Sequence, residues 1–238
     1  MSGILYLIPT PLGAESDHAA ILPEAVRQTA LSLDTYVAEN PKTARHFLKS
    51  LGLNRPLQEI AIATLDEHTT PEQVQQLLTP LLAGKNVGLV SEAGCPAVAD
   101  PGAHLVKLAH EHGIRVVPLV GPSSILLALM ASGMNGQSFT FHGYLPANRE
   151  ERIKRLGELE KESRAKHQTQ IFIETPYRNT QMFEDVLRAC KGDTRLCVAT
   201  DITQAGESIV TRTVSAWKKT PPDIHKKPTI FLLYCGKS

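Results

Sequence analysis

The fold of this chain is constrained most by a regular alternation of short apolar runs with segments that carry helix signals. Residues 4–8, ILYLI, form an unbroken apolar run that ends in Pro-Thr-Pro, as a strand buried on both faces does. The segment 70–84 opens with Thr-Pro-Glu-Gln, a capping box with proline at the first helical position, and closes on glycine. Strands that alternate with helices form a parallel sheet with helices on both faces.

The same pattern predicts elements along the whole chain. The first half contains predicted strands at 4–8, 35–38, 87–90 and 114–118, and predicted helices at 41–52, at 70–84 and before Gly113. The second half contains predicted helices at 125–131, 148–166 and 177–190, and predicted strands at 138–142, 170–173, 195–200, 207–214 and 228–235. The last strands follow one another without a helix, which indicates a mixed or antiparallel sheet. We therefore predict an α/β fold of two αβα domains, residues 1–119 and 120–238, with a mostly parallel first sheet and a mixed second sheet.

Composition is typical of a soluble globular protein, because 42% of the 238 residues are hydrophobic and 21% are charged. A formal net charge of +1 argues against bulk non-specific binding of nucleic acid, but it does not exclude a local basic face. The four cysteines contain no Cys-x-x-Cys pair, so we expect neither a disulfide framework nor a cysteine zinc site. No apolar stretch approaches the about 20 residues of a membrane span, and the first residues lack the basic region of a signal peptide. We expect a cytoplasmic protein with no membrane contact.

Three unusual loops follow predicted strands. They are PTPLG at 9–13, SEAGCPAVADPG at 91–102 and GPSS at 121–124. In open α/β sheets ligands bind at the carboxyl ends of the strands, and glycine and serine there let the backbone approach a ligand. Turns use the same residues, so a purely structural role is the alternative for each loop. Three such loops together favour a ligand site.

The absence of several common motifs argues against familiar activities. The chain has neither GxxxxGK[ST] nor GxGxxG, and GPSSI is not the GxSxG of a serine hydrolase. His110-Glu111-His112 lies at a predicted helix end, where polar residues serve the helix terminus, so we expect no metal site. The segment 149–166 carries seven Lys or Arg against five Glu. It is either a solvated helix with i,i+4 ion pairs or a face that binds nucleic acid.

An ordered set of motifs resembles a known family. The set is YLIPTPLG, DEHT, LVSEAGCPAVADPG, VVPLVGPSS, FTFHGYLP, FIETPYR and DITQAGE, which together lie within about residues 3–210. It resembles the tetrapyrrole methylase superfamily of S-adenosylmethionine-dependent methyltransferases. Within that superfamily it is most similar to the enzymes that methylate a cytidine ribose 2′-hydroxyl in small-subunit ribosomal RNA.

The resemblance implies a homodimer of two-domain chains, with S-adenosylmethionine in a cleft between the two domains. Leu12 and Gly13 would lie at the cofactor after the first strand. The motif after the predicted strand at 87–90 would meet the ribose or methionine portion of the cofactor, and the GPSS serines would bind its carboxylate or amino end. Residues from the second domain would line the adenine. The implied cofactor-binding residues are Leu12, Gly13, Ser91, Glu92, Ala93, Val98, Ser123, Ser124, Ile173 and Glu174.

Methyl transfer from a sulfonium needs no metal and depends mainly on positioning, but a ribose hydroxyl is a poor nucleophile that a general base would assist. Candidate bases are Glu39, Asp66, Glu67, His68, Asp100 and Glu174. We favour Glu39 and Asp100, with capping of the next helix as the alternative role of Asp100. Residues expected to contact the acceptor or the phosphates of ribosomal RNA are Pro9, Thr10, Pro11, Tyr144, Arg149, Arg152, Arg155 and Arg178.

The chain departs from the pattern of the RNA enzymes in several places, and these departures leave three hypotheses. Glu39 lies in Ala-Glu-Asn-Pro-Lys where those enzymes usually have EDTR, and SDAGTP is replaced by SEAGCP, with Glu92 and Cys95. The chain is an RNA methyltransferase, a methyltransferase for a tetrapyrrole or other small molecule, or a cofactor-binding protein that has lost catalysis. A tetrapyrrole enzyme would be expected to carry a GDP-type loop, which this chain lacks.

Overall fold

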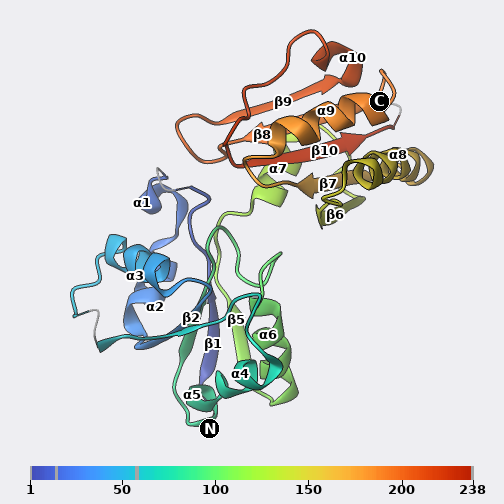
Figure 1. The fold of residues 1–238 in the computed structure, drawn as a ribbon. Coiled ribbons are helices and arrows are strands. Elements are labelled where there is room, and N and C mark those ends of the chain that lie inside the picture. The colour runs from blue at the N-terminus through green and yellow to red at the C-terminus, as the bar shows by residue number, and fades with distance from the viewer. Residues whose placement is uncertain (1, 14–15, 57–58, 237–238) are drawn as a thin grey trace. The chain divides into compact units, whose positions relative to one another are not determined.

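The computed structural model describes residues 2–13, 16–56 and 59–236 of the chain (Figure 1). The chain divides into two compact units, Met1–Ser123 and Ser124–Ser238, each with its own sheet. Within the described residues, no helix is both long enough and apolar enough to cross a membrane.

The first unit is built on a five-stranded sheet in the order β3-β2-β4-β1-β5. Every pair of neighbouring strands is parallel, as the alternation of strands and helices predicts. The strands are β1 (Ile4–Ile8), β2 (Thr35–Ala38), β3 (Ala61–Thr64), β4 (Val87–Val90) and β5 (Arg115–Pro118). The sequence pattern missed β3. This strand is a short edge strand with no buried residue, so it lacks the apolar run that marks the central strands.

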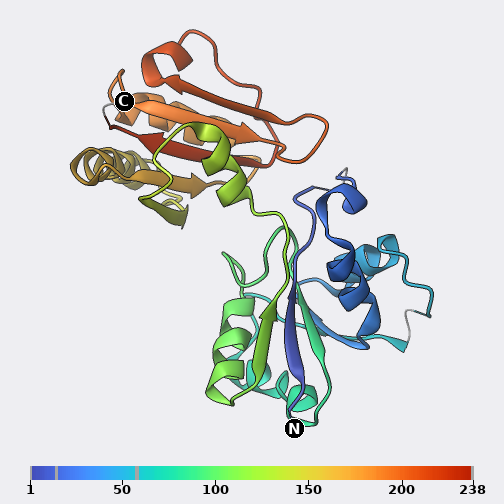
Figure 2. The same ribbon diagram turned by 180° about the vertical axis from the view of Figure 1, so that it is seen from behind.

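Helices cover both faces of the first sheet (Figures 1 and 2). They are α1 (His18–Ile21), α2 (Glu24–Ser32), α3 (Pro41–Ser50), α4 (Pro71–Gln76), α5 (Thr79–Leu82) and α6 (Gly102–Glu111). Successive residues of β2 point to opposite faces, because Tyr36 packs into the core beneath α2 and α3, whereas Val37 packs into the core with α4 to α6. The sequence pattern missed α1 and α2, and it merged α4 and α5 into one helix.

Two predicted helix starts are confirmed in atomic detail. The side chain of Asn40 accepts a hydrogen bond from the Lys42 backbone at 2.9 Å, with Pro41 at the first position of α3. The capping box of α4 is complete: Gln73 Oε1 accepts from the Thr70 backbone at 2.8 Å, and Thr70 Oγ1 accepts from the Gln73 backbone at 3.4 Å. Local sequence therefore determines where α3 and α4 begin.

The second unit is built on a mixed sheet in the order β6-β7-β10-β8-β9. Its strands are β6 (Phe139–Tyr144), β7 (Thr169–Ile173), β8 (Arg195–Thr200), β9 (Ser208–Thr213) and β10 (Thr229–Tyr234). The β6–β7 pair is parallel and the other pairs are antiparallel, which confirms the mixed sheet. The register of β6 shifts between Phe141 and Tyr144, where Gly143 has a φ of 64°.

Two long helices and one short helix of the second unit pack on one face of its sheet, and a fourth helix covers the other (Figures 1 and 2). The helices are α7 (Ser124–Ser132), α8 (Arg149–Lys166), α9 (Asn179–Ala189) and the short α10 (Val214–Trp217). Leu156 of α8, Phe183 of α9 and Trp217 of α10 lie in one core with Phe172 and Phe231 of the sheet. The helix α7 buries Ala128 and Leu129 and lies on the opposite face of the sheet.

Substitution of Gly88 tests the packing of the first sheet. A Cβ at this position would lie 2.6 Å from Ile8 Cδ1 and 3.0 Å from Tyr36 Cδ1. We expect Gly88→Ala to lower the free energy of unfolding by about 1–3 kcal/mol, because the core cannot accept the extra methyl group without strain. Gly157→Ala is the matched control: it lies in α8 with open space around it, so it should raise stability by about 0.5–1 kcal/mol. Urea denaturation of both variants measures the difference, and equal effects would contradict this account of the packing.

Candidate functional site

The carboxyl edge of the first sheet gathers the three unusual loops. Since β1, β4 and β5 are parallel neighbours, the loops that follow them emerge at the same edge. Glu39 directly follows β2, which pairs with β4, so it emerges at this edge as well. The parallel topology therefore brings together residues that are up to 112 positions apart in the sequence, from Pro9 to Gly121.

A backbone bridge joins the loop after β1 to the loop after β4. Thr10 and Gly94 exchange two hydrogen bonds, with N···O distances of 2.9 and 3.1 Å. The buried hydroxyls of Thr10 and Ser91 lie 3.2 Å apart, and Ser91 Oγ donates to the Gly94 carbonyl at 2.6 Å. The Ser91 hydroxyl proton is therefore used inside the loop, where it fixes the turn.

Two glycines permit this close approach. Gly94 has a φ of 73°, and a Cβ there would lie 3.2 Å from the Pro122 carbonyl oxygen. A Cβ at Gly121 would lie 2.2 Å from Pro9 Cγ, so the loops after β1 and β5 also touch. Cys95 Sγ lies 3.4 Å from the Pro122 carbonyl oxygen, and burial raises the pKa of this thiol. The three loops thus form one packed backbone cradle.

The open side of this cradle is lined by residues 92–93. Both residues are exposed, and no acceptor for their backbone N–H groups is found among the residues that the structure describes. Glu92 Oε1 accepts a hydrogen bond from Thr43 Oγ1 of α3 at 2.8 Å, which holds the carboxylate beside the start of that helix. Free N–H groups next to a fixed carboxylate can bind a polar ligand that both accepts and donates hydrogen bonds.

Acidic side chains surround Glu39 at this edge. Although Glu39 is largely exposed, partial desolvation of its carboxyl is the main cause that raises its pKa. The charges of Glu92 and Asp100 raise the pKa of Glu39 further, with smaller effects from Glu67 and Asp66. Glu39 therefore holds a proton more readily than an ordinary glutamate does.

Asp100 has a structural role in the loop after β4. Its Oδ1 accepts from the backbone N–H of Gly102 at 2.6 Å and of Ala97 at 3.2 Å. Gly102 begins α6, so the contact matches the helix-start role that the sequence left open for Asp100. Ala97 and Ala99 have φ values of 65° and 55°, a conformation that costs energy for alanine. Between them, Val98 is exposed, so this strained loop presents an apolar side chain to solvent.

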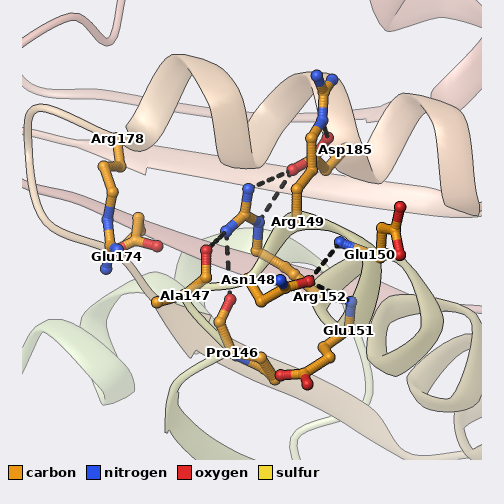
Figure 3. Close-up of polar contacts among 10 residues, drawn as sticks. All are labelled: Pro146, Ala147, Asn148, Arg149, Glu150, Glu151, Arg152, Glu174, Arg178 and Asp185. Carbon is orange, nitrogen blue, oxygen red and sulfur yellow. Dashed lines mark hydrogen bonds and ion pairs between the residues drawn. The ribbon is translucent and has the colours of Figure 1, made fainter.

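The second unit carries the remaining predicted site residues. Glu174 directly follows β7 and is buried, and Figure 3 shows it next to Arg178. Its Oε1 accepts from Arg178 Nη2 at 2.6 Å and from the Thr175 backbone at 2.7 Å. Its Oε2 and the buried Oδ1 of Asn179 have no hydrogen-bond partner within the described part of the chain. A buried acceptor without a donor is a position where a bound N–H group or a water would be stabilised.

The prediction that Arg152 contributes to a basic face on α8 is wrong, because Arg152 is only 1% exposed. Its Nε and Nη2 both donate to Asp185 Oδ2, at 2.9 and 2.6 Å, and its Nη1 donates to the Pro146 and Ala147 carbonyls (Figure 3). This guanidinium is buried because α8 and α9 pack together around the carboxylate of Asp185, which is fully buried. A phosphate cannot reach Arg152 in this arrangement.

The other two arginines of that face differ from Arg152. Arg155 donates from Nη1 to Glu158 and Glu162, so acidic neighbours on its own helix already neutralise it. The side chain of Arg149 is 48% exposed and donates only from Nε, to Asp185 Oδ1 at 2.8 Å. Within the described residues its two terminal nitrogens have no hydrogen-bond partner, so Arg149 keeps donors for a ligand.

Sequence reasoning missed Asp185 and Thr43. Asp185 is one acid on an amphipathic helix, and no local pattern indicates that two arginines from another helix will surround it. Thr43 is in the first turn of α3, and its bond to Glu92 depends on tertiary structure. The described residues contain no group of three or more His, Cys, Asp or Glu side chains that could hold a metal ion.

The fold defines a class of protein. The methyltransferase CobJ has a solved structure that matches with a TM-score of 0.63 at 18% identity, covering 98% of this chain and 94% of that chain. Uroporphyrin-III-C-methyltransferase from Thermus thermophilus matches with a TM-score of 0.55 at 16% identity, covering 98% and 93%. At these identities the likeness shows the fold, which is that of the tetrapyrrole methyltransferases.

The sequence comparisons then show the family. The model of the Tetrapyrrole (Corrin/Porphyrin) Methylases matches residues 5–217. Ribosomal RNA small subunit methyltransferase I of Vibrio cholerae is 34% identical over 87% of this chain and 67% of its own length. The proteins of the same name from Escherichia coli O157:H7 and Bacillus subtilis are 33% identical, over 97% and 90% of this chain and 77% and 68% of their own lengths. The chain belongs to the tetrapyrrole methylase family, and it is an S-adenosylmethionine-dependent methyltransferase, as its motifs predict.

The two arginines bound to Asp185 should respond differently to substitution. Arg152→Met leaves a buried carboxylate without its main partner, so we expect a loss of about 3–5 kcal/mol in the free energy of unfolding. Arg149→Met removes a half-exposed partner and should cost no more than about 1 kcal/mol. Chemical denaturation of both variants checks this, and similar losses would show that Asp185 does not depend on Arg152.

Proposed function

We propose that this methyltransferase modifies the ribose 2′-hydroxyl of a cytidine in small-subunit ribosomal RNA, in the cytoplasm and as a homodimer. The observation that carries the proposal is the cradle joined by Thr10 and Gly94, with free N–H groups and an acidic rim at one sheet edge. The choice of RNA rests on relatives named for small-subunit ribosomal RNA, which match 87–97% of this chain.

The cradle fits S-adenosylmethionine chemically. The free N–H groups of residues 92–93 suit carboxylate or hydroxyl oxygens, and the carboxylates around Glu39 favour a positively charged sulfonium. In the second unit, the unpartnered Glu174 Oε2 suits an N–H donor such as the adenine amino group. The residues proposed to hold the cofactor are Leu12, Gly13, Ser91, Glu92, Ala93, Val98, Ser123, Ser124, Ile173 and Glu174. When bound, the cofactor supplies an electrophilic methyl group.

Glu39 is the favoured general base. The ribose hydroxyl must lose its proton as its oxygen forms the new bond to carbon, and a carboxylate with a raised pKa is a better acceptor than an ordinary one. Asp100 is less suited to this role, because its Oδ1 is already bonded to two backbone N–H groups. Pro9, Thr10, Pro11 and Tyr144 are proposed to shape the acceptor pocket, and Arg149 and Arg178 to contact phosphates.

Two assays test the proposal. Calorimetric titration with S-adenosylmethionine should show binding. If no binding is observed, every hypothesis that requires the cofactor is excluded. The protein should then transfer labelled methyl groups to undermethylated small ribosomal subunits, and nucleoside analysis should recover 2′-O-methylcytidine. Label that enters only a precorrin mixture would instead support a small-molecule enzyme. Cofactor binding without transfer to either acceptor would support a binding protein that has lost catalysis.

Substitution of Glu39 tests the base. We expect Glu39→Gln to lower the rate of methyl transfer by about 10²–10⁴-fold at neutral pH, because the amide cannot accept the proton. Affinity for the cofactor should change little. Glu67→Gln is the matched control, since Glu67 contributes only a minor part of the raised pKa. Equal rates in Glu39→Gln and the wild type would exclude Glu39 as the base.

The raised pKa of Glu39 predicts that Glu39→Gln changes the stability of the protein in a pH-dependent way. Because the pKa of Glu39 is raised in the folded state, the folded protein binds this proton more tightly than the unfolded chain. Ionisation therefore lowers stability as the pH rises through the raised pKa. We expect Glu39→Gln to melt at a higher temperature than the wild type at pH 7, and at the same temperature below about pH 4. A difference that persists at low pH would contradict an electrostatic cause.

A further inference from the structure

Exposed aromatic rings gather at one edge of the second sheet. Because β6 and β7 are parallel neighbours, Tyr144 at the end of β6 and the loop after β7 lie at the same edge. Tyr144 is 59% exposed, and Tyr177 in that loop is 75% exposed. Phe139 is 39% exposed and begins β6 at the opposite edge.

Tyr177 is paired with a cation. Lys226 Nζ lies 5.8 Å from the centroid of the Tyr177 ring, within the range of a cation–π interaction. Lys226 is exposed and forms no ion pair with a carboxylate in the part of the chain that the structure describes. The next residue, Lys227, is different, because its ammonium pairs with Asp223 at 2.8 Å. Lys226 therefore keeps its charge available.

The backbone around this pair is held by hydrogen bonds. The Lys226 N–H donates to the Pro176 carbonyl at 3.1 Å, which joins the turn before β10 to the loop after β7. Asn179, which is fully buried, donates from Nδ2 to the Lys227 carbonyl at 2.7 Å. Lys226 has a φ of 60°, a conformation that a lysine adopts only when its surroundings hold it. The ring and the ammonium are therefore carried on a preorganised support.

The exposed ring of Tyr177 has no role in the packing of the core. The ring contributes to none of the buried clusters, and no hydrogen bond of its hydroxyl is found among the described residues. Arg178 is next to it and is neutralised by Glu174, so this arginine adds hydrogen-bond donors without a strong net charge. An exposed aromatic ring with an ammonium over one face can bind an unpaired nucleotide, since a base can stack on the other face while its phosphate meets the cation.

We propose that Tyr177 stacks on an unpaired base of the RNA substrate and that Lys226 binds the phosphate next to that base. The inference rests on the proposed function, because it requires an RNA substrate. It assigns to this pair the recognition of a single-stranded segment. Double-stranded RNA hides its base faces in the stack, so a tyrosine ring gains little from it.

Substitution of Tyr177 tests the stacking. We expect Tyr177→Ala to weaken binding of small-subunit RNA by about 5- to 150-fold, the range for loss of one stacked base. The effect should appear in KM for RNA, with kcat at saturating RNA and affinity for the cofactor unchanged. Tyr177→Trp retains an aromatic face and should bind within about threefold of the wild type. Phe139→Ala is the matched control at the opposite edge, and it should leave RNA affinity unchanged.

Fluorescence gives a direct readout of stacking. The chain has one tryptophan, Trp217, which is buried, so Tyr177→Trp adds an exposed indole on a quiet background. Addition of a single-stranded RNA oligonucleotide that contains cytidine should quench the new emission, and the wild-type emission should stay constant. Absence of quenching at saturating oligonucleotide would overturn the stacking.

Salt dependence tests Lys226. We expect Lys226→Gln to reduce the slope of log affinity against log salt by about 0.7, the value for one phosphate contact on a single strand. Lys161→Gln, at an exposed site on α8, is the matched control and should leave the slope unchanged. Identical slopes for the wild type and Lys226→Gln would show that Lys226 does not contact a phosphate.

The outcomes separate the two proposals. If the wild type neither binds nor methylates ribosomal RNA, the proposed function fails, and this inference fails with it. If the wild type methylates RNA while Tyr177→Ala retains full affinity, only this inference fails. Thermal denaturation of each variant confirms that it is folded, which the exposure of Tyr177 and Lys226 leads us to expect.

Discussion

The site in the first unit depends on the pair of backbone hydrogen bonds between Thr10 and Gly94. These bonds lock the loop after β1 to the loop after β4, and the contact of Gly121 with Pro9 adds the loop after β5. Because the backbone itself makes these contacts, the N–H groups of residues 92–93 are left to face outward. The acidic neighbours of Glu39 lie at the same sheet edge, so the cradle that we propose as the cofactor site has a carboxylate with a raised pKa beside it.

A second constraint is the buried carboxylate of Asp185. It binds Arg152 within the core, and it accepts one hydrogen bond from Arg149 Nε. The two terminal nitrogens of Arg149 are left for a ligand. A helix that is rich in charge thus offers far fewer free cations than its composition indicates. Charges available to an acidic partner also lie at the sheet edge where β6 and β7 end, around Arg149 and Lys226.

Much of the fold could be predicted from the sequence because its signals are local. The run at Ile4–Ile8, the Asn40 cap and the Thr70 capping box each act within a few residues, and all three are confirmed. The elements that were missed are too short, too exposed or too weakly capped for local signals to identify them. The strand β3 is an edge strand with no buried residue, α1 has only four residues despite its Asp17 cap, and α2 begins after Pro23 without a side-chain cap. Their stability comes from tertiary packing, which a window of sequence does not contain.

The sequence by itself determined the alternation of strands and helices, the family motifs and the positions of the strand-end loops, since these follow from chain-local periodicity and residue type. Only the tertiary structure decided which of the motif residues keep free hydrogen-bonding groups. Ser91 and Asp100 form hydrogen bonds with the backbone of their own loop. Arg152 is neutralised in the core, whereas Lys226 remains available next to Tyr177. The physical reason is that a polar group is available only when no neighbour satisfies it, and those neighbours come from distant parts of the chain.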